Sequence, residues 1–184
     1  MNGNALEELK SEFNLDNKSI DFLPGFFNYI ECHLEMRNIP EVKKYLIVGL
    51  SNLMFSNKKS DESKEDEAGD FEEDEEIAKE KKNLRSRLDL LFARFNLAIK
   101  KYEESIEKLT NSIILYSEIF GPESVGLMPH YYYLANYFAE KPFEKDDTQE
   151  LREIIIRNIY LKIADIWRKQ FLGEKNENFE SNFK

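Results

Sequence analysis

Residues 100–135 constrain the fold most, because they contain two helical patterns separated by a tight turn. Over residues 102–119, apolar residues recur every three to four positions, which is the period of a helix that buries one face. Gly121-Pro122 stops this pattern, and a second helical pattern begins at Val125. The segment therefore predicts the second helix of one antiparallel pair, a turn, and the first helix of the next pair.

The same period predicts six helices in three consecutive pairs. Their expected bounds are 21–36 with 40–56, 77–99 with 102–119, and 125–138 with 151–171. Pro40 suits the first turn of its helix, and the Thr148 hydroxyl can cap the last one. Seven glycines and five prolines are few for an all-β chain, which needs many turns. The sequence thus predicts an all-α protein.

Composition divides the chain into four predicted segments. They are residues 1–56, with a short N-terminal helix at Leu6, Leu9 and Phe13 and the first helix pair; residues 57–80, an acidic flexible insertion; residues 81–172, with the second and third pairs; and residues 173–184, a flexible tail. Terminal pairs of a short array expose apolar surface, so we expect other subunits to cover the ends.

The net charge of −10 arises from the insertion alone. Between Asp61 and Glu80 there are twelve acidic residues and two lysines, so the rest of the chain is neutral overall. Such a run repels itself and buries little, which indicates a solvated, disordered loop. The alternative is a docking strip for a basic surface, whose attraction would weaken as salt is added.

The sequence lacks the residue sets that most chemistry requires. Cys32 is the only cysteine and there are two histidines, so neither a disulfide nor a cysteine-rich zinc site can form. No nucleophile elbow, phosphate loop or Ser/His/Asp set is present. His130 has no second ligand nearby and is interpreted as a surface or capping residue. We therefore expect no enzyme, and no catalytic, cofactor-binding or metal-binding residues.

Two classes of partner are also excluded. No apolar run approaches the roughly 20 residues of a membrane span, so we expect a soluble, intracellular protein without membrane contact. The nearest basic cluster consists of Arg85, Arg87 and Arg94, which are spread among acids along one helix. This spacing is typical of a solvated helix face, and it does not indicate nucleic-acid binding.

The second helix pair resembles the tetratricopeptide (TPR) repeat in the residues that pack its helices. That repeat needs a small residue in the first helix, an aromatic residue that opens the second, and a small residue four positions before a large apolar one. The matching residues are Ala93, Tyr102, Ser105 and Leu109, with Ser112 as another small contact and Ala135 where the pattern begins again. The resemblance implies a TPR-like array of about three antiparallel hairpins.

The first pair departs from this pattern. Its corresponding positions hold Ile30, Ile39, Val42 and Leu46, which are larger than the repeat usually allows. We therefore expect the crossing of its two helices to differ from that of the second pair.

A narrower resemblance covers most of the chain. The order FLPGFF, KKYEES, FGPES, YYYLANYF and IADIWRKQFL is similar to the TPR portion of axonemal zinc-finger MYND-domain proteins, which associate with single-headed inner-arm dyneins. Residues 84–172 carry it best. The zinc-binding module is missing and the acidic insertion is not part of the family pattern, so the chain is either a short paralogue or a truncated product.

This resemblance implies a function and a location. It implies a non-catalytic scaffold subunit that helps attach inner dynein arms to doublet microtubules, within a large hetero-complex of the cilium or flagellum axoneme. The subunit is cytoplasmic before assembly. The implied partners are an inner-arm dynein heavy chain and another axonemal TPR protein. The alternative function is a cytosolic TPR adaptor that grips a peptide or chaperone through clustered Lys and Arg side chains, although no such cluster is apparent in the sequence.

Five aromatic residues are the candidates for partner binding: Tyr131, Tyr132, Tyr133, Tyr137 and Trp167. Aromatic residues at helical spacing lie more often in the core than at an interface. Successive residues of a helix, however, point about 100° apart, so three consecutive tyrosines span about 200°. At least one of the three should therefore be exposed or covered by a partner.

Overall fold

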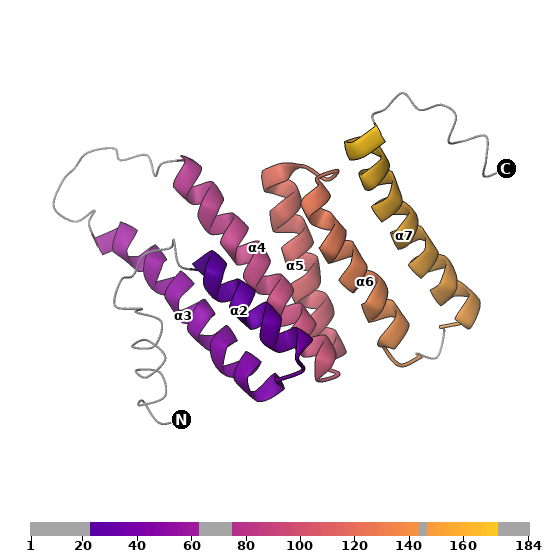
Figure 1. Ribbon diagram of the computed structural model, residues 1–184, viewed down its shortest axis with the longest axis horizontal. Coiled ribbons are helices and arrows are strands. Elements are labelled where there is room, and N and C mark those ends of the chain that lie inside the picture. Colours follow the sequence, from indigo (N-terminus) through magenta and orange to yellow (C-terminus); the bar gives the residue numbers. More distant parts are fainter. Residues whose placement is uncertain (1–22, 63–74, 144–146, 173–184) are drawn as a thin grey trace.

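The computed structural model describes residues 23–62, 75–143 and 147–172, without the side chains of residues 55–62. Over these ranges the chain forms six α-helices and one short 3-10 helix, packs them antiparallel and contains no strand (Figure 1). The predicted all-α class is thus confirmed. The expected N-terminal helix and the tail 173–184 lie outside the described residues.

Each predicted helix corresponds to one in the structure. The elements are α2 (Leu23–Glu35), α3 (Ile39–Glu62), α4 (Glu75–Ala98), α5 (Tyr102–Phe120), η2 (Val125–Leu127), α6 (Met128–Glu140) and α7 (Gln149–Leu172). The Leu151 amide donates to the Thr148 hydroxyl at 3.1 Å, which confirms the predicted cap of α7.

The predicted insertion 57–80 is too long at both ends. Helix α3 continues to Glu62, and α4 begins at Glu75. Lys and Glu are good helix formers, and Glu75 and Glu76 lie in the first turn of α4, where the helix dipole stabilises carboxylates. The density of charged residues therefore did not prevent helix formation at the end of α3 or at the start of α4. Residues 63–74 lie outside the described part of the chain.

The first two hairpins use the same turn. Arg37 and Lys100 each follow a helix with positive φ, at 56° and 61°. After α2, the Asn38 and Arg37 amides donate to the carbonyls of His33 and Leu34, at 2.9 and 3.0 Å. The corresponding residues after α4 repeat both hydrogen bonds, from Lys101 to Asn96 at 2.8 Å and from Lys100 to Leu97 at 2.9 Å. Both turns are therefore Schellman motifs. They lead the chain directly from α2 into the antiparallel α3, and from α4 into the antiparallel α5.

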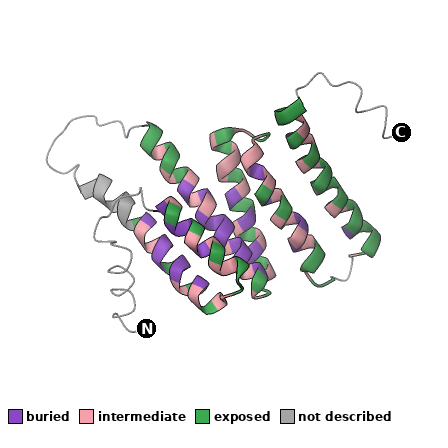
Figure 2. Ribbon diagram, viewed as in Figure 1, coloured by how far each residue is buried: buried purple, intermediate pink, exposed green. Residues whose placement is uncertain are grey.

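The main core lies among α2, α3 and α4. Its buried residues are Leu23, Phe26, Phe27, Ile30, Val42, Tyr45, Leu46, Val48, Leu53, Leu84, Leu88, Leu91 and Phe95. Figure 2 shows buried residues concentrated in α2 to α5, whereas α7 is mostly exposed. The molecule is consequently packed most densely at its N-terminal hairpins.

Serines hold α4 and α5 together. The Ser105 hydroxyl donates to the Ala93 carbonyl at 2.9 Å, and the Ser112 hydroxyl donates to the Ser86 carbonyl at 2.6 Å. Ser86 reciprocates by donating to the Ser112 carbonyl at 2.9 Å. These bonds satisfy hydroxyls that are almost inaccessible to water, and small side chains let the two backbones approach. Ser86 is not one of the residues that the repeat pattern identifies.

The remaining TPR-pattern residues pack close by. Leu109 lies in a small core cluster with Leu90 and Ala93, and Ala135 of α6 is buried. Tyr102 is partly buried, with its ring centroid 6.4 Å from that of Tyr137.

Gly49 is the small residue that lets α3 approach its neighbours. A Cβ at Gly49 would lie 3.2 Å from Cε1 of Phe27 in α2 and 3.5 Å from Cδ1 of Leu88 in α4. The large residues Ile30, Val42 and Leu46 are all buried in the same cluster. The first pair therefore achieves close contact through a glycine that the repeat pattern did not identify.

The Gly49→Ala variant should have a lower free energy of unfolding than the Gly25→Ala variant. Both glycines are helical, so each change gains about 0.5–1 kcal/mol of helix propensity. Nothing lies within 4 Å of a Cβ at Gly25, whereas Gly49→Ala must displace Phe27. We expect Gly49→Ala to be about 1–2 kcal/mol less stable than Gly25→Ala in urea denaturation. Equal stabilisation by both changes would show that α3 is not in tight contact with α2.

Candidate protein-binding groove

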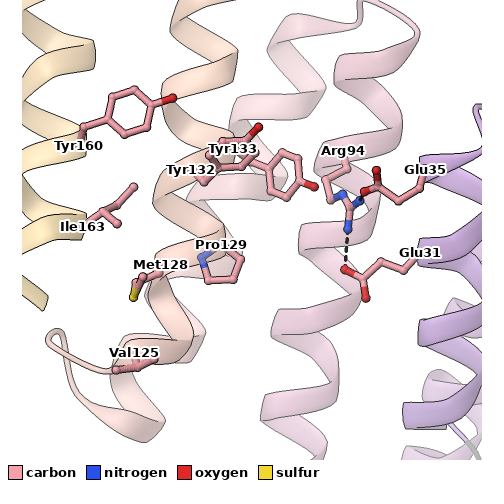
Figure 3. Close-up of a pocket in the computed structure, with 10 residues that line it drawn as sticks. All are labelled: Glu31, Glu35, Arg94, Val125, Met128, Pro129, Tyr132, Tyr133, Tyr160 and Ile163. Atoms are coloured by element: carbon pink, nitrogen blue, oxygen red, sulfur yellow. Dashed lines mark hydrogen bonds and ion pairs between the residues drawn. The ribbon is translucent and has the colours of Figure 1, made fainter. Parts of the chain in front are cut away.

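A groove lies between α2, α4, α6 and α7, with a volume of about 610 Å³. Its lining residues are Glu31 and Glu35 of α2, Arg94 of α4, Val125, Met128, Pro129, Tyr132 and Tyr133 of η2 and α6, and Tyr160 and Ile163 of α7 (Figure 3). A second hollow of about 410 Å³ shares Glu35, Arg94, Tyr132 and Tyr133. It extends the groove towards Arg37, Asn136 and Glu140. Together the two hollows are called the groove below.

Arg94 forms the floor of the groove and joins three helices. Its side chain is 6% exposed, and Nη1 donates to Oε1 of Glu31 at 2.5 Å while Nη2 donates to Glu35. The guanidinium lies 4.5 Å from the ring centroid of Tyr133 in α6, a cation–π distance. The prediction that Arg94 belongs to a solvated helix face is therefore wrong. The sequence pattern does not show that α2 places two carboxylates over this position of α4.

The three consecutive tyrosines differ in their surroundings. Tyr132 is 46% exposed and lines the groove. Tyr133 also lines it but is partly buried, and this burial raises the pKa of its hydroxyl. Tyr131 is partly buried and is not among the lining residues. The groove therefore contains two of the three residues.

The other two aromatic candidates lie outside the groove. Tyr137 is buried between α5 and α6, against Tyr102, so its proposed role in partner binding is replaced by a packing role. Trp167 is 46% exposed on α7, with its ring centroid 5.4 Å from that of Phe171. Trp167 is therefore accessible, but it belongs to a separate surface.

Several lining residues were missed by sequence analysis. Tyr160 is 45% exposed and, with Ile163, supplies the α7 side of the groove. Glu31 and Glu35 supply the α2 side. No local signal marks these residues, because they meet only when α2 and α7 approach α6.

Helix α7 packs along α6 but buries few of its residues. Ile166 and Arg152 are its buried residues. Arg152 donates to the carbonyls of Lys141 at 2.6 Å and Pro142 at 3.2 Å, and to Asp147 at 3.1 Å. This arginine thus fastens the start of α7 to the connection after α6.

Much apolar surface remains uncovered on α7. The exposed large apolar residues are Leu151, Ile154, Tyr160, Leu161, Trp167, Phe171 and Leu172. Trp167 and Phe171 adjoin on this surface, and exposed apolar residues that adjoin commonly mark protein interfaces.

His130 was predicted to be a surface or capping residue; it is buried, so the surface alternative is wrong. Its Nδ1 lies 3.0 Å from the Gly126 carbonyl, which can only accept, so Nδ1 carries the proton. The ring also packs against Tyr116, with centroids 5.2 Å apart. Burial lowers the pKa of His130 to about 4, because a charged imidazole would lose its hydration, although the Gly126 carbonyl partly offsets this effect.

The described residues contain no group of three or more His, Cys, Asp or Glu side chains that could hold a metal ion. None of the described helices is long and apolar enough to cross a membrane.

No protein-family model matches the chain, and no curated protein or solved structure is significantly similar to it. The axonemal resemblance thus stays a prediction.

Proposed function

We propose that the protein is a non-catalytic scaffold or adaptor whose groove binds a segment of a partner protein. The observation that carries this proposal is the exposed aromatic surface inside the groove. Tyr132 and Tyr160 each keep nearly half of their surface accessible, next to partly buried Met128 and Ile163. Exposed aromatic residues in a concave apolar setting supply much of the binding energy at protein interfaces.

We further propose that the architecture is TPR-like. The three hairpins would be α2–α3, α4–α5 and α6–α7, and the first helix of each contributes to the groove. The repeated turns at Arg37 and Lys100 and the paired serines of α4 and α5 support a repeated unit. Stacked units of this kind form extended concave binding surfaces.

The proposed cellular setting is the axoneme of a cilium or flagellum. In this proposal the chain helps attach or assemble inner-arm dynein on doublet microtubules, after entering from a cytoplasmic pool. Its partners are an inner-arm dynein heavy chain and another axonemal TPR protein. The support is the resemblance of residues 84–172, together with the uncovered apolar residues of α7, which suit a subunit of a large complex.

A cytosolic TPR adaptor for a peptide or chaperone is the alternative. A carboxylate clamp needs cations that are available to the peptide terminus. Arg94 is bound by Glu31 and Glu35, which leaves its guanidinium poorly placed for a ligand carboxylate. This observation favours the scaffold over the clamp.

Crosslinking mass spectrometry on isolated axonemes tests both the proposed axonemal location and the proposed binding surface. We expect crosslinks from Lys141, Lys162 and Lys169, which flank or lie on α7, to an inner-arm dynein subunit. High salt should release the chain together with inner-arm dynein. A purely cytosolic, monomeric pool would contradict the axonemal proposal.

Truncating the groove tyrosines should weaken partner binding. Tyr132→Ala and Tyr160→Ala each remove an accessible aromatic contact, so we expect each to lower the affinity about tenfold. Isothermal titration calorimetry with the crosslinked partner measures the change. Tyr131→Ala is the matched control, because Tyr131 does not line the groove, and circular dichroism confirms that each variant folds. Unchanged affinity in both groove variants would place the binding surface elsewhere.

A further inference from the structure

We propose that the groove recognises a segment that is both basic and apolar. An Arg or Lys of the partner contacts the carboxylates of α2 and α6, and a neighbouring large apolar side chain contacts the aromatic residues of α6 and α7. The inference rests on the proposed function, because it assigns the chemistry of the partner that occupies the same groove.

The accessible charge of the groove is mainly negative. The side chains of Glu31 and Glu35 are 39% and 71% exposed, and Glu140 is exposed at the far end. Arg94 lies beneath its two glutamates and is almost inaccessible, whereas Arg37 is the exposed cation among the residues of the two hollows. Glu31 also lies 3.6 Å from the guanidinium of Arg87 beside the groove, whose side chain is 33% exposed. Glu35 and Glu140 are then the accessible carboxylates opposite Arg37 among the lining residues, and this excess of negative charge favours a cationic ligand.

The ion pairs of Arg94 also discriminate between ligand charges. An anionic side chain could reach Arg94 only by displacing Glu31 or Glu35, which would leave a displaced carboxylate beside it. A cationic side chain can add to Glu35, whose side chain is 71% exposed, without breaking either pair. Adding a cation therefore costs less reorganisation than adding an anion.

The opposite side of the groove is apolar and aromatic. Figure 3 shows Tyr160 and Ile163 facing the groove from α7, with Tyr132 and Tyr133 between them and the glutamates of α2. Tyrosine rings attract cations over their faces as well as apolar groups, and Arg94 already adopts this geometry over Tyr133 at 4.5 Å. A segment with both kinds of side chain can therefore contact both sides at once.

Three synthetic peptides of equal length test the proposal against the full-length chain. The first combines Leu with Arg, the second replaces every Arg with Glu, and the third replaces every Leu with Ser. Fluorescence anisotropy should show that the Leu/Arg peptide binds at least about tenfold more tightly than the other two. Its affinity should also fall as salt is raised, because the accessible carboxylates contribute through charge.

Paired substitutions locate the effect in the groove. Glu35→Gln combined with Glu140→Gln should weaken the Leu/Arg peptide by about 3- to 10-fold and reduce its salt dependence. The matched control is Glu103→Gln with Glu107→Gln, which removes two exposed charges from α5 outside the groove. General attraction to the acidic chain would respond equally to both pairs, and that result would overturn the proposal.

Two other outcomes separate the chemistry from the function. If the Leu/Glu peptide binds as tightly as the Leu/Arg peptide and Tyr132→Ala weakens both, the groove binds proteins but its proposed charge preference is wrong. If no peptide binds, or if neither the tyrosine nor the glutamate variants alter binding, the groove itself is contradicted as the binding surface.

Discussion

The Phe27→Ala variant is expected to lose about 3–5 kcal/mol of unfolding free energy. Phe27 has no exposed surface and lies in the cluster that joins α2, α3 and α4. A Cβ at Gly49 would already be 3.2 Å from its ring, which shows how closely α3 packs there. Truncation removes the buried ring and leaves a cavity that these close helices can fill only partly. Urea denaturation followed by circular dichroism measures the loss.

Leu161→Ala provides the control for this prediction. Leu161 is 60% exposed on α7, so its truncation should change the free energy of unfolding by less than about 0.5 kcal/mol. Amide hydrogen exchange should likewise show weaker protection in α7 than in α4, because α7 buries few side chains. A large loss for Leu161→Ala would indicate that α7 is covered in solution, for example by self-association.

The protein should lose stability between about pH 6.5 and pH 4 through His130. Because burial lowers the folded-state pKa of His130 to about 4, the unfolded state binds more protons across this window. The contribution of His130 is fully present above pH 6.5 and decreases as pH falls, by at most about 3 kcal/mol. Below about pH 4 both states are protonated, so this group adds no further loss.

The structure explains why protonation is unfavourable there. With Nδ1 bonded to the Gly126 carbonyl, Nε2 is the nitrogen that must accept the added proton. This atom is buried and has no hydrogen-bond partner among the described residues. Protonation would therefore place a charged donor in a site without an acceptor.

Urea denaturation at a series of pH values tests the prediction. His130→Asn retains an amide donor for the Gly126 carbonyl but cannot titrate, so its stability should depend less on pH between 4 and 6.5. His33→Asn is the matched control, because it makes the same substitution at the other histidine, which is only partly buried. Parallel curves for His130→Asn and the parent would refute the assignment to His130.

These two predictions concern the stability contributed by buried residues, whereas the groove concerns binding by exposed ones. Phe27 belongs to the dense N-terminal core, and His130 lies where η2 and α6 pack against Tyr116 of α5. Tyr160 and Ile163 come from the least buried helix. Partner binding can therefore be altered at α7 without a large loss of folding energy, which makes the proposed binding variants practical.

Local sequence patterns were sufficient for the order of the helices and the packing of the second hairpin. The helical period located the six helices of the described ranges, and the small residues Ala93, Ser105 and Ser112 lie where α4 and α5 approach each other. Such features depend on residues close together in the chain. The ends of α3 and α4 in the acidic region were less predictable. High charge favours a disordered chain there, whereas the helix propensity of Glu and Lys favours a helix.

The sequence by itself determined an all-α chain of paired helices, because apolar period and turn residues are local properties. Only the tertiary structure decided which side chains became buried and which met in the groove. Arg94 is buried because α2 supplies Glu31 and Glu35, and Tyr160 faces Tyr132 because α7 folds back along α6. These contacts join residues far apart in sequence, so they depend on how the helices pack and not on the pattern within any one helix.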